Sequence, residues 1–142
     1  MKRLLLCAFL ALGASCTQQT WSDQSASGSP GSGTWGPALT VLEHQCVHCH
    51  GDNRLSSMPP INDTQALSKL IGSHWIVPGK PQVSRFFQVV TFPDEIPGAM
   101  PPSGHAISAK DVQILSDWIK AGARLPAQRI KLKPQGPLPR ST

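Results

Sequence analysis

Two cysteines separated by two residues and followed at once by a histidine constrain this chain more than any other feature. They lie in the segment Cys46-Val47-His48-Cys49-His50. The spacing brings two thiols and an imidazole onto one short stretch of backbone. C-x-x-C-H is the attachment pattern for haem c, while a C-x-x-C pair also occurs as a thioredoxin-like redox pair or as half of a zinc site. The compartment and the rest of the chain decide among these chemistries.

The N-terminus has the pattern of an export signal. Lys2 and Arg3 form a basic start, and an apolar run of nine residues, 4–12, follows them. A run of that length is too short to span a bilayer, which takes roughly 20 residues, but it suits the apolar region of a signal peptide. Small residues then lead to Cys16. We therefore expect residues 1–15 to be a lipoprotein-type signal peptide and Cys16 to be lipidated after cleavage.

The alternative for Cys16 is ordinary cleavage near Ser15, because Gly13 stands where lipoprotein signals usually have an aliphatic residue. Lipidation is preferred, since a cysteine this close to the end of an apolar signal region has few other uses. Thr17 follows it, whereas the usual inner-membrane retention signal resembles an aspartate at that place. We expect an exported protein, lipid-anchored on the periplasmic face of a bacterial membrane, with the outer membrane favoured.

Export decides how the cysteine pair is interpreted. Of four cysteines, Cys7 leaves with the signal and Cys16 serves as the anchor, so no disulfide framework is expected for the folded part. The sequence shows no βαβ pattern of a thioredoxin-like protein and no second ligand pair for zinc. We predict one covalent haem c on Cys46 and Cys49, with His50 as the proximal ligand of the iron.

The distal ligand is expected to be a methionine. Met58 and Met100 are each followed by two prolines, which stiffen the backbone. Met58 lies only eight residues after His50, and so short a segment would have to be nearly extended to pass around the edge of a haem. Met100 lies fifty residues after His50 and is the favoured ligand, with His105 as the main rival. The remaining histidines are expected to be surface or hydrogen-bonding residues, with His44 and His48 pointing to solvent and His74 near a turn.

Helical periodicity and proline-rich loops predict an all-α domain. We expect helices over residues 38–46, 64–71, 82–90 and 108–121. Asp63 is the expected N-cap of the second helix and Ser108 that of the fourth. The inward face of the third helix is expected to carry Val83, Phe86, Phe87 and Val90. That of the fourth is expected to carry Val112, Leu115, Trp118 and Ile119.

Both flanks of this domain differ from it in composition. Residues 16–36 are rich in Ser, Gly, Gln and Thr and are expected to form the anchor cysteine and a flexible tether. Residues 126–142 lack periodicity and are expected to be a basic, proline-rich, disordered tail. The whole chain has a net charge of +5, but residues 17–123 are mildly acidic because they hold six Lys or Arg against eight Asp or Glu. Export and this non-basic body argue against nucleic-acid recognition.

Three segments carry a resemblance to a known family: CVHCHGD, VPGKPQVSRFF and AMPPSGHAISAKDVQILSDWIKAGA. Together they resemble a class I c-type cytochrome domain, and more narrowly the planctomycete-type cytochrome c domains, over residues 38–125. The resemblance implies a domain over 37–125, all-α with about four helices wrapped round one haem, whose first and last helices pack together. It also implies that Cys46 and Cys49 carry the haem, with His50 proximal and Met100 distal.

The function expected from these features is that of a monohaem cytochrome. It would carry single electrons between periplasmic or membrane-bound redox partner proteins and would not be an enzyme, because His50 and Met100 fill both axial positions. One alternative is a haem sensor or small haem enzyme with a labile sixth ligand, where only His105 offers acid–base chemistry. The other is an accessory electron-conduit subunit whose basic tail docks on an acidic partner or an anionic membrane.

Overall fold

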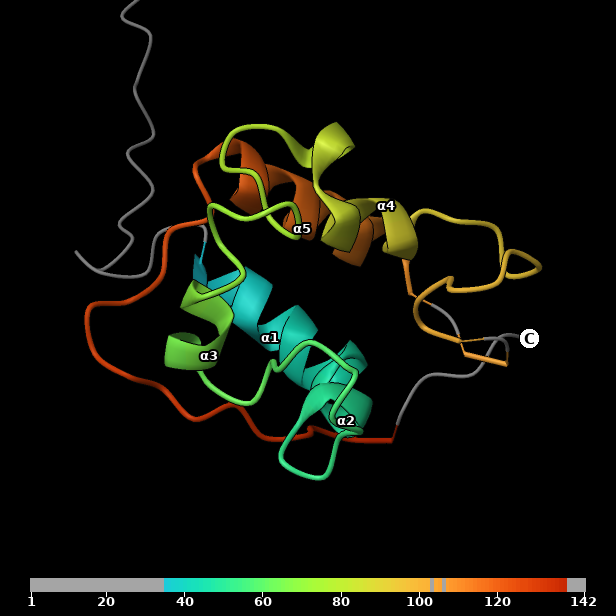
Figure 1. The fold of residues 1–142 in the computed structure, drawn as a ribbon, viewed down its shortest axis with the longest axis horizontal. Helices are drawn as coiled ribbons and strands as arrows, with labels where there is room; N and C mark the ends of the chain where they lie inside the picture. Colours follow the sequence, from blue (N-terminus) through green and yellow to red (C-terminus); the bar gives the residue numbers. More distant parts are fainter. Residues whose placement is uncertain (1–34, 103, 106, 138–142) are drawn as a thin grey trace, which may run out of the picture.

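The computed structural model describes residues 35–102, 104, 105 and 107–137, so the predicted signal peptide, Cys16 and most of the tether lie outside the described residues. The described chain forms α1 (Trp35–Gln45), α2 (Val47–His50), α3 (Thr64–Ser68), the 3₁₀ turn η1 (Pro81–Val83), α4 (Arg85–Val90) and α5 (Ala109–Lys120) (Figure 1). This part of the chain contains two isolated β-bridges and no strand. The all-α prediction is confirmed at this level. Within the same residues, no helix is long and apolar enough to cross a bilayer.

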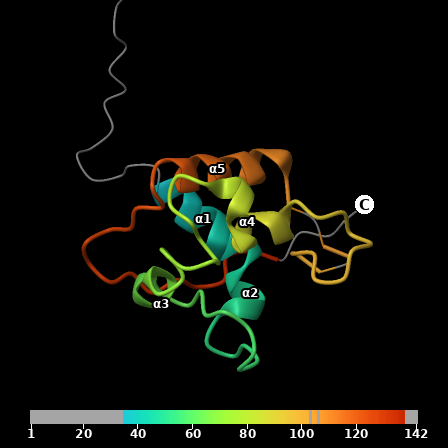
Figure 2. The same ribbon diagram turned by 45° about the horizontal axis from the view of Figure 1, so that its top comes forward.

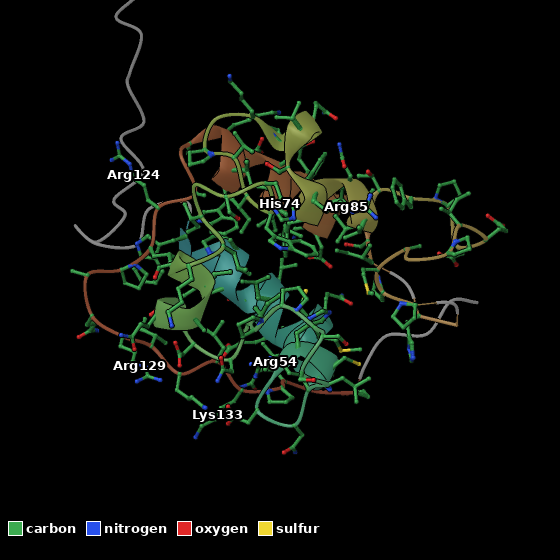
Figure 3. The ribbon with its side chains drawn as sticks, in the orientation of Figure 1. Arg54, His74, Arg85, Arg124, Arg129 and Lys133 are labelled. Carbon is green, nitrogen blue, oxygen red and sulfur yellow. The ribbon has the colours of Figure 1, made fainter. Side chains whose placement is uncertain are left out.

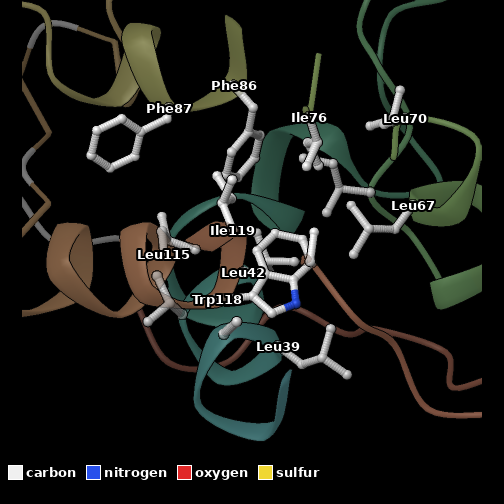
Figure 4. Packing of buried hydrophobic residues seen from close by; sticks show 14 of the residues in the cluster. Leu39, Leu42, Leu67, Leu70, Ile76, Phe86, Phe87, Leu115, Trp118 and Ile119 are labelled. Atoms are coloured by element: carbon white, nitrogen blue, oxygen red, sulfur yellow. The ribbon is translucent and has the colours of Figure 1, made fainter. Parts of the chain in front are cut away.

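The core forms where α1 packs against α5 (Figure 4). Leu42 of α1 and Trp118 of α5 are both fully buried, and each such side chain contributes about 1.5–3 kcal/mol by leaving water. Trp118 also donates its indole N–H to the carbonyl oxygen of Arg124 at 2.8 Å, which satisfies its polar atom. The first and last helices therefore pack together through these buried side chains, as the resemblance implied.

Two of the predicted helix starts are confirmed by their caps. The Asp63 carboxylate accepts from the backbone N–H of Ala66 at 2.7 Å, and the Ser108 hydroxyl accepts from that of Asp111 at 3.0 Å. The first helix begins at Trp35, two residues before the predicted domain start at 37. Its indole packs against the core, so this end of the expected tether belongs to the folded domain.

The third predicted helix is interrupted. Ser84 takes an extended conformation between η1 and α4, because its buried hydroxyl accepts from the Val77 N–H and donates to the Lys80 carbonyl, both at 2.9 Å. Phe86 and other α4 residues point into the core as expected. Val83 does not: its side chain is 57% exposed, so its predicted inward position is wrong.

The segment after α5 folds against the domain. Residues 124–137, here called the C-terminal strap, pass beside α3 and continue next to α2 (Figures 1 and 2). Leu132 is only 2% exposed and belongs to the core, and its N–H donates to the Asn62 carbonyl at 2.9 Å. The predicted disorder is therefore wrong for residues 126–137, while 138–142 lie outside the described residues. The missed signal is the alternation Arg-Ile-Lys-Leu-Lys, which is typical of an extended segment with one buried face.

Candidate functional site

A largely apolar cavity lies among α1, α2, α4, the loop between α2 and α3 and the loop between α4 and α5. Its empty volume, which includes space open to solvent, is about 950 Å³. Its apolar walls are formed mainly by Ile61, Leu70, Trp75, Phe86, Val89, Val90 and Ile107. The four residues predicted to hold a haem also line it, namely Cys46, Cys49, His50 and Met100.

The cysteine motif forms a helical turn that continues α1. The backbone N–H of Cys46 donates to Leu42 O at 2.8 Å, and that of His50 donates to Cys46 O at 2.9 Å. Residues three apart on a helix share a face, so both thiols reach the same cavity. Cys46 is half-buried, Cys49 is exposed and neither is in a disulfide.

Gly51 ends this turn at a place where no side chain fits. A Cβ atom there would lie 2.5 Å from the carbonyl oxygen of Val47, a backbone atom that has no freedom to swing away. Any other residue at position 51 would therefore force the backbone after His50 to shift. This gives a physical reason for the glycine that follows C-x-x-C-H in the sequence.

His50 has a fixed tautomer. Its Nδ1 atom lies 2.9 Å from the carbonyl oxygen of Pro59. Because a carbonyl only accepts, Nδ1 carries a proton, and in the neutral imidazole Nε2 therefore keeps the lone pair. The chain also returns to the same residue through Ile61, whose N–H donates to His50 O at 2.9 Å. Histidines that bind metals are typically oriented by such a bond from the other ring nitrogen.

Met100 reaches the cavity from the loop between α4 and α5. Its N–H donates to the carbonyl oxygen of Val89 at 2.8 Å, which ties this loop to α4. Met58 is half-buried, but it is not among the described residues that line the cavity. Of the two candidate methionines, the structure brings only Met100 to the wall that His50 shares.

The other histidines lie away from the cavity lining. His44 and His74 are exposed, and the His74 ring stacks near Trp75 at 5.1 Å between centroids. His105 is half-buried and does not line the cavity. His48 was expected to point to solvent, but its Nε2 is buried with no hydrogen-bond partner among the described residues. His48 lines a small pocket together with strap residues 131–134.

The environment of Cys46 favours a neutral thiol. Burial, with the charge of Cys49 as a smaller cause, raises the pKa of Cys46 to about 12. A redox-active or zinc-binding cysteine instead needs an accessible thiolate. A structural zinc site also takes four ligands, and the described residues contain no group of three or more His, Cys, Asp or Glu side chains placed to hold a metal ion.

Arg85 is a site residue that the sequence did not single out. Among the described residues lining the cavity it is the only Lys or Arg. Its guanidinium carbon lies 5.2 Å from the centroid of the Phe92 ring, and Figure 3 shows it beside α4. A signal existed, because Arg85 and Val89 are four residues apart and share a face of α4. The acceptor role of the Pro59 carbonyl has no comparable signal, since any residue has a carbonyl.

Comparison with known proteins identifies no relative. No protein-family model, curated protein or solved structure matches this chain. The geometry and chemistry of the cavity are therefore the basis on which a function is proposed.

Proposed function

We propose that this chain is a monohaem c-type cytochrome that carries single electrons between redox partner proteins. One observation supports the proposal above all. Two thiols, an imidazole whose Nδ1 donates to a carbonyl and a thioether line a single apolar cavity, although the thioether comes from a segment fifty residues away. These are the group types that attach haem c and ligate its iron through His and Met.

The residues present fit such a group. Cys46 and Cys49 would hold it through thioether bonds, and His50 Nε2 and the Met100 sulfur would be the axial ligands. Arg85 would pair with the carboxylates that haem carries at its edge, because a guanidinium prefers planar, bidentate partners. When bound, the haem supplies a one-electron ferric/ferrous couple.

The protein's own contribution is to position the ligand groups and to exclude water. The Pro59 carbonyl fixes the His50 ring, and the apolar walls, such as Phe86 at 6% exposure, keep water from the reacting centre. A methionine ligand raises the reduction potential relative to histidine. Because His50 and Met100 would both ligate the iron, no position would stay open for substrate, so we propose a carrier and not an enzyme.

The proposed location is the periplasmic face of a bacterial membrane, with the outer membrane favoured. The proposal depends on residues 1–16, which lie outside the described residues. A Cys16→Ser variant should be exported but should lose both fatty-acid labelling and membrane association. Equal membrane association of the variant and the natural chain would contradict the lipid anchor.

The deciding experiment is expression of the full chain with a haem-attachment system, followed by intact mass and optical spectra. We expect the mass of one covalent haem and, in the oxidised protein, a charge-transfer band from methionine to iron. Covalent haem without that band, together with carbon monoxide binding to the reduced protein, would replace the carrier by a haem sensor or enzyme. No covalent haem would contradict the proposal as a whole.

A further inference from the structure

The C-terminal strap lies against loop 51–62, the loop that carries the hydrogen-bond acceptor of His50. The Leu132 N–H donates to the carbonyl oxygen of Asn62 at 2.9 Å, and the Thr64 N–H donates to that of Ile130 at 3.0 Å. Leu132 is 2% exposed in the core. The strap is thus attached to the end of the loop by both backbone and side-chain contacts.

The strap also reaches the beginning of that loop. The Lys131 ammonium lies 2.6 Å from the Asp52 carboxylate, and Asn62 Nδ2 donates to Asp52 Oδ1 at 2.8 Å. Asp52 and Asn62 are therefore joined to each other and to two consecutive strap residues, Lys131 and Leu132. Arg129 forms an ion pair with the buried Asp63, immediately after the loop.

These contacts involve two of the four positive charges of the strap. Arg129 and Lys131 are each paired with a carboxylate of the same domain. Exposed ion pairs alone are weak, so the buried Leu132 and the backbone bonds hold the strap, and the ion pairs set its register. The arrangement favours an internal role over that of a free arm for an acidic partner.

The end of the loop that the strap holds lies next to the two residues that hydrogen-bond to His50. Pro59 O accepts from His50 Nδ1, and Ile61 N–H donates to His50 O. Only two residues separate Pro59 from Asn62, and one of them is a second proline, which leaves this stretch little freedom to absorb a displacement. A shift of Asn62 would therefore move the Pro59 carbonyl.

We infer that Leu132 and Lys131 are positioning residues for His50, which they control by holding loop 51–62 so that the Pro59 carbonyl stays on Nδ1. The inference rests on the proposed function, in which His50 ligates iron. A hydrogen bond from Nδ1–H makes Nε2 a more basic ligand, which stabilises ferric iron. Releasing the strap weakens that bond and raises the reduction potential.

The test uses the full-length, haem-loaded protein and two leucine substitutions. Leu132→Ala removes a buried strap side chain, whereas Leu55→Ala removes the same atoms from loop 51–62 itself, where Leu55 is 67% exposed. We expect Leu132→Ala to retain covalent haem, to raise the midpoint potential and to speed hydrogen exchange of the Ile61 amide by about tenfold or more. Leu55→Ala should match the natural chain in all three measurements.

Two further variants keep the test decisive. Lys131→Met breaks the ion pair to Asp52 and should speed hydrogen exchange of the Ile61 amide by a smaller amount than Leu132→Ala, even where Leu132→Ala does not fold. A chain ending after Pro137 retains the described strap and should behave like the full chain.

The outcomes separate this inference from the proposed function. A natural chain without covalent haem overturns the proposed function and this inference with it. With a haem-loaded natural chain, an unaltered potential and Ile61 exchange in Leu132→Ala, or an unaltered Ile61 exchange in Lys131→Met, overturns the inference alone. Faster exchange spread equally over α5 would indicate a general loss of stability and would also overturn it.

Discussion

The Nδ1 atom of His50 lies 2.9 Å from the carbonyl oxygen of Pro59, nine residues further along the chain. In the neutral ring this one bond assigns the proton to Nδ1 and leaves the lone pair on Nε2, the atom that we propose as the iron ligand. Nothing in the C-x-x-C-H pattern specifies it. The pattern supplies an imidazole at the right place, and a separate loop, returning through Ile61, gives that imidazole its orientation.

The distal assignment predicts a clear difference between the two methionines. Met100→Ala should keep the covalent haem, because both cysteines remain, but open the sixth position. We expect a high-spin spectrum, carbon monoxide binding and a potential lower by on the order of 100 mV. Optical spectroscopy and redox titration measure these changes.

Met58→Ala serves as the matched control for that variant. Met58 is also followed by two prolines but does not line the cavity. Its spectrum and potential should equal those of the natural chain. A normal methionine-to-iron band in Met100→Ala, or its loss in Met58→Ala, would contradict the assignment.

A second prediction concerns the charge in the cavity wall. The positive charge of Arg85 stabilises the reduced, less positive iron centre relative to the oxidised one. Replacing Arg85 by glutamine removes that charge. Arg85→Gln should therefore lower the midpoint potential by roughly 20–60 mV, or about 0.5–1.4 kcal/mol for one electron. The exposed Lys69 does not line the cavity, so Lys69→Gln removes the same charge as a control and should shift the potential less. Equal shifts would show that only net charge matters.

Much of the fold was predictable because its signals are local. The caps Asp63 and Ser108 act within three residues, and the α5 stripe follows simple periodicity, so both are visible in the sequence. Val83 was misplaced because the interruption depends on Ser84, whose hydroxyl bonds to residues brought near by the fold. The strap was missed because its pattern extends over only five residues and its partners lie about 70 positions earlier.

The candidate site was likewise predictable from the sequence only in part. Cys46, Cys49, His50 and Met100 could be singled out from residue type and spacing. Their gathering in one cavity is a property of the folded chain. The groups that orient them, a carbonyl oxygen on loop 51–62 and a buried leucine on the strap, carry no distinctive residue type. Supporting contacts of this kind therefore become visible only in three dimensions.

Gly51 gives a prediction about stability. Gly51→Ala would place a Cβ atom 2.5 Å from Val47 O, so the backbone after His50 must shift. We expect a loss of about 1–3 kcal/mol in the free energy of unfolding, as for other overpacked sites, measured by urea denaturation. Gly36 in α1 has no atom within 4 Å of its added Cβ, so Gly36→Ala should be neutral or slightly stabilising. Comparable losses at both positions would refute the steric argument.

The ion pair between Asp63 and the strap should make the stability of the fold depend on pH. Burial alone would raise its pKa, but the Ala66 N–H and the Arg129 guanidinium outweigh this effect and hold the pKa below its ordinary value. A carboxylate whose pKa is lower in the folded state stabilises the fold above its unfolded pKa of about 3.9. That contribution is lost as the pH falls through the folded pKa. Stability should therefore decline in acid.

Asparagine at position 63 tests this origin of acid sensitivity, because it keeps an oxygen for the helix cap but has no charge for Arg129. Asp63→Asn should be less stable than the natural chain by about 1–2 kcal/mol at pH 7, and the difference should shrink toward pH ~2. Urea denaturation at both pH values measures it. Asp117→Asn changes an exposed pair with Lys120 and should cost less than about 0.5 kcal/mol. A gap between Asp63→Asn and the natural chain that stays constant with pH would mean that the charge of Asp63 does not stabilise the fold.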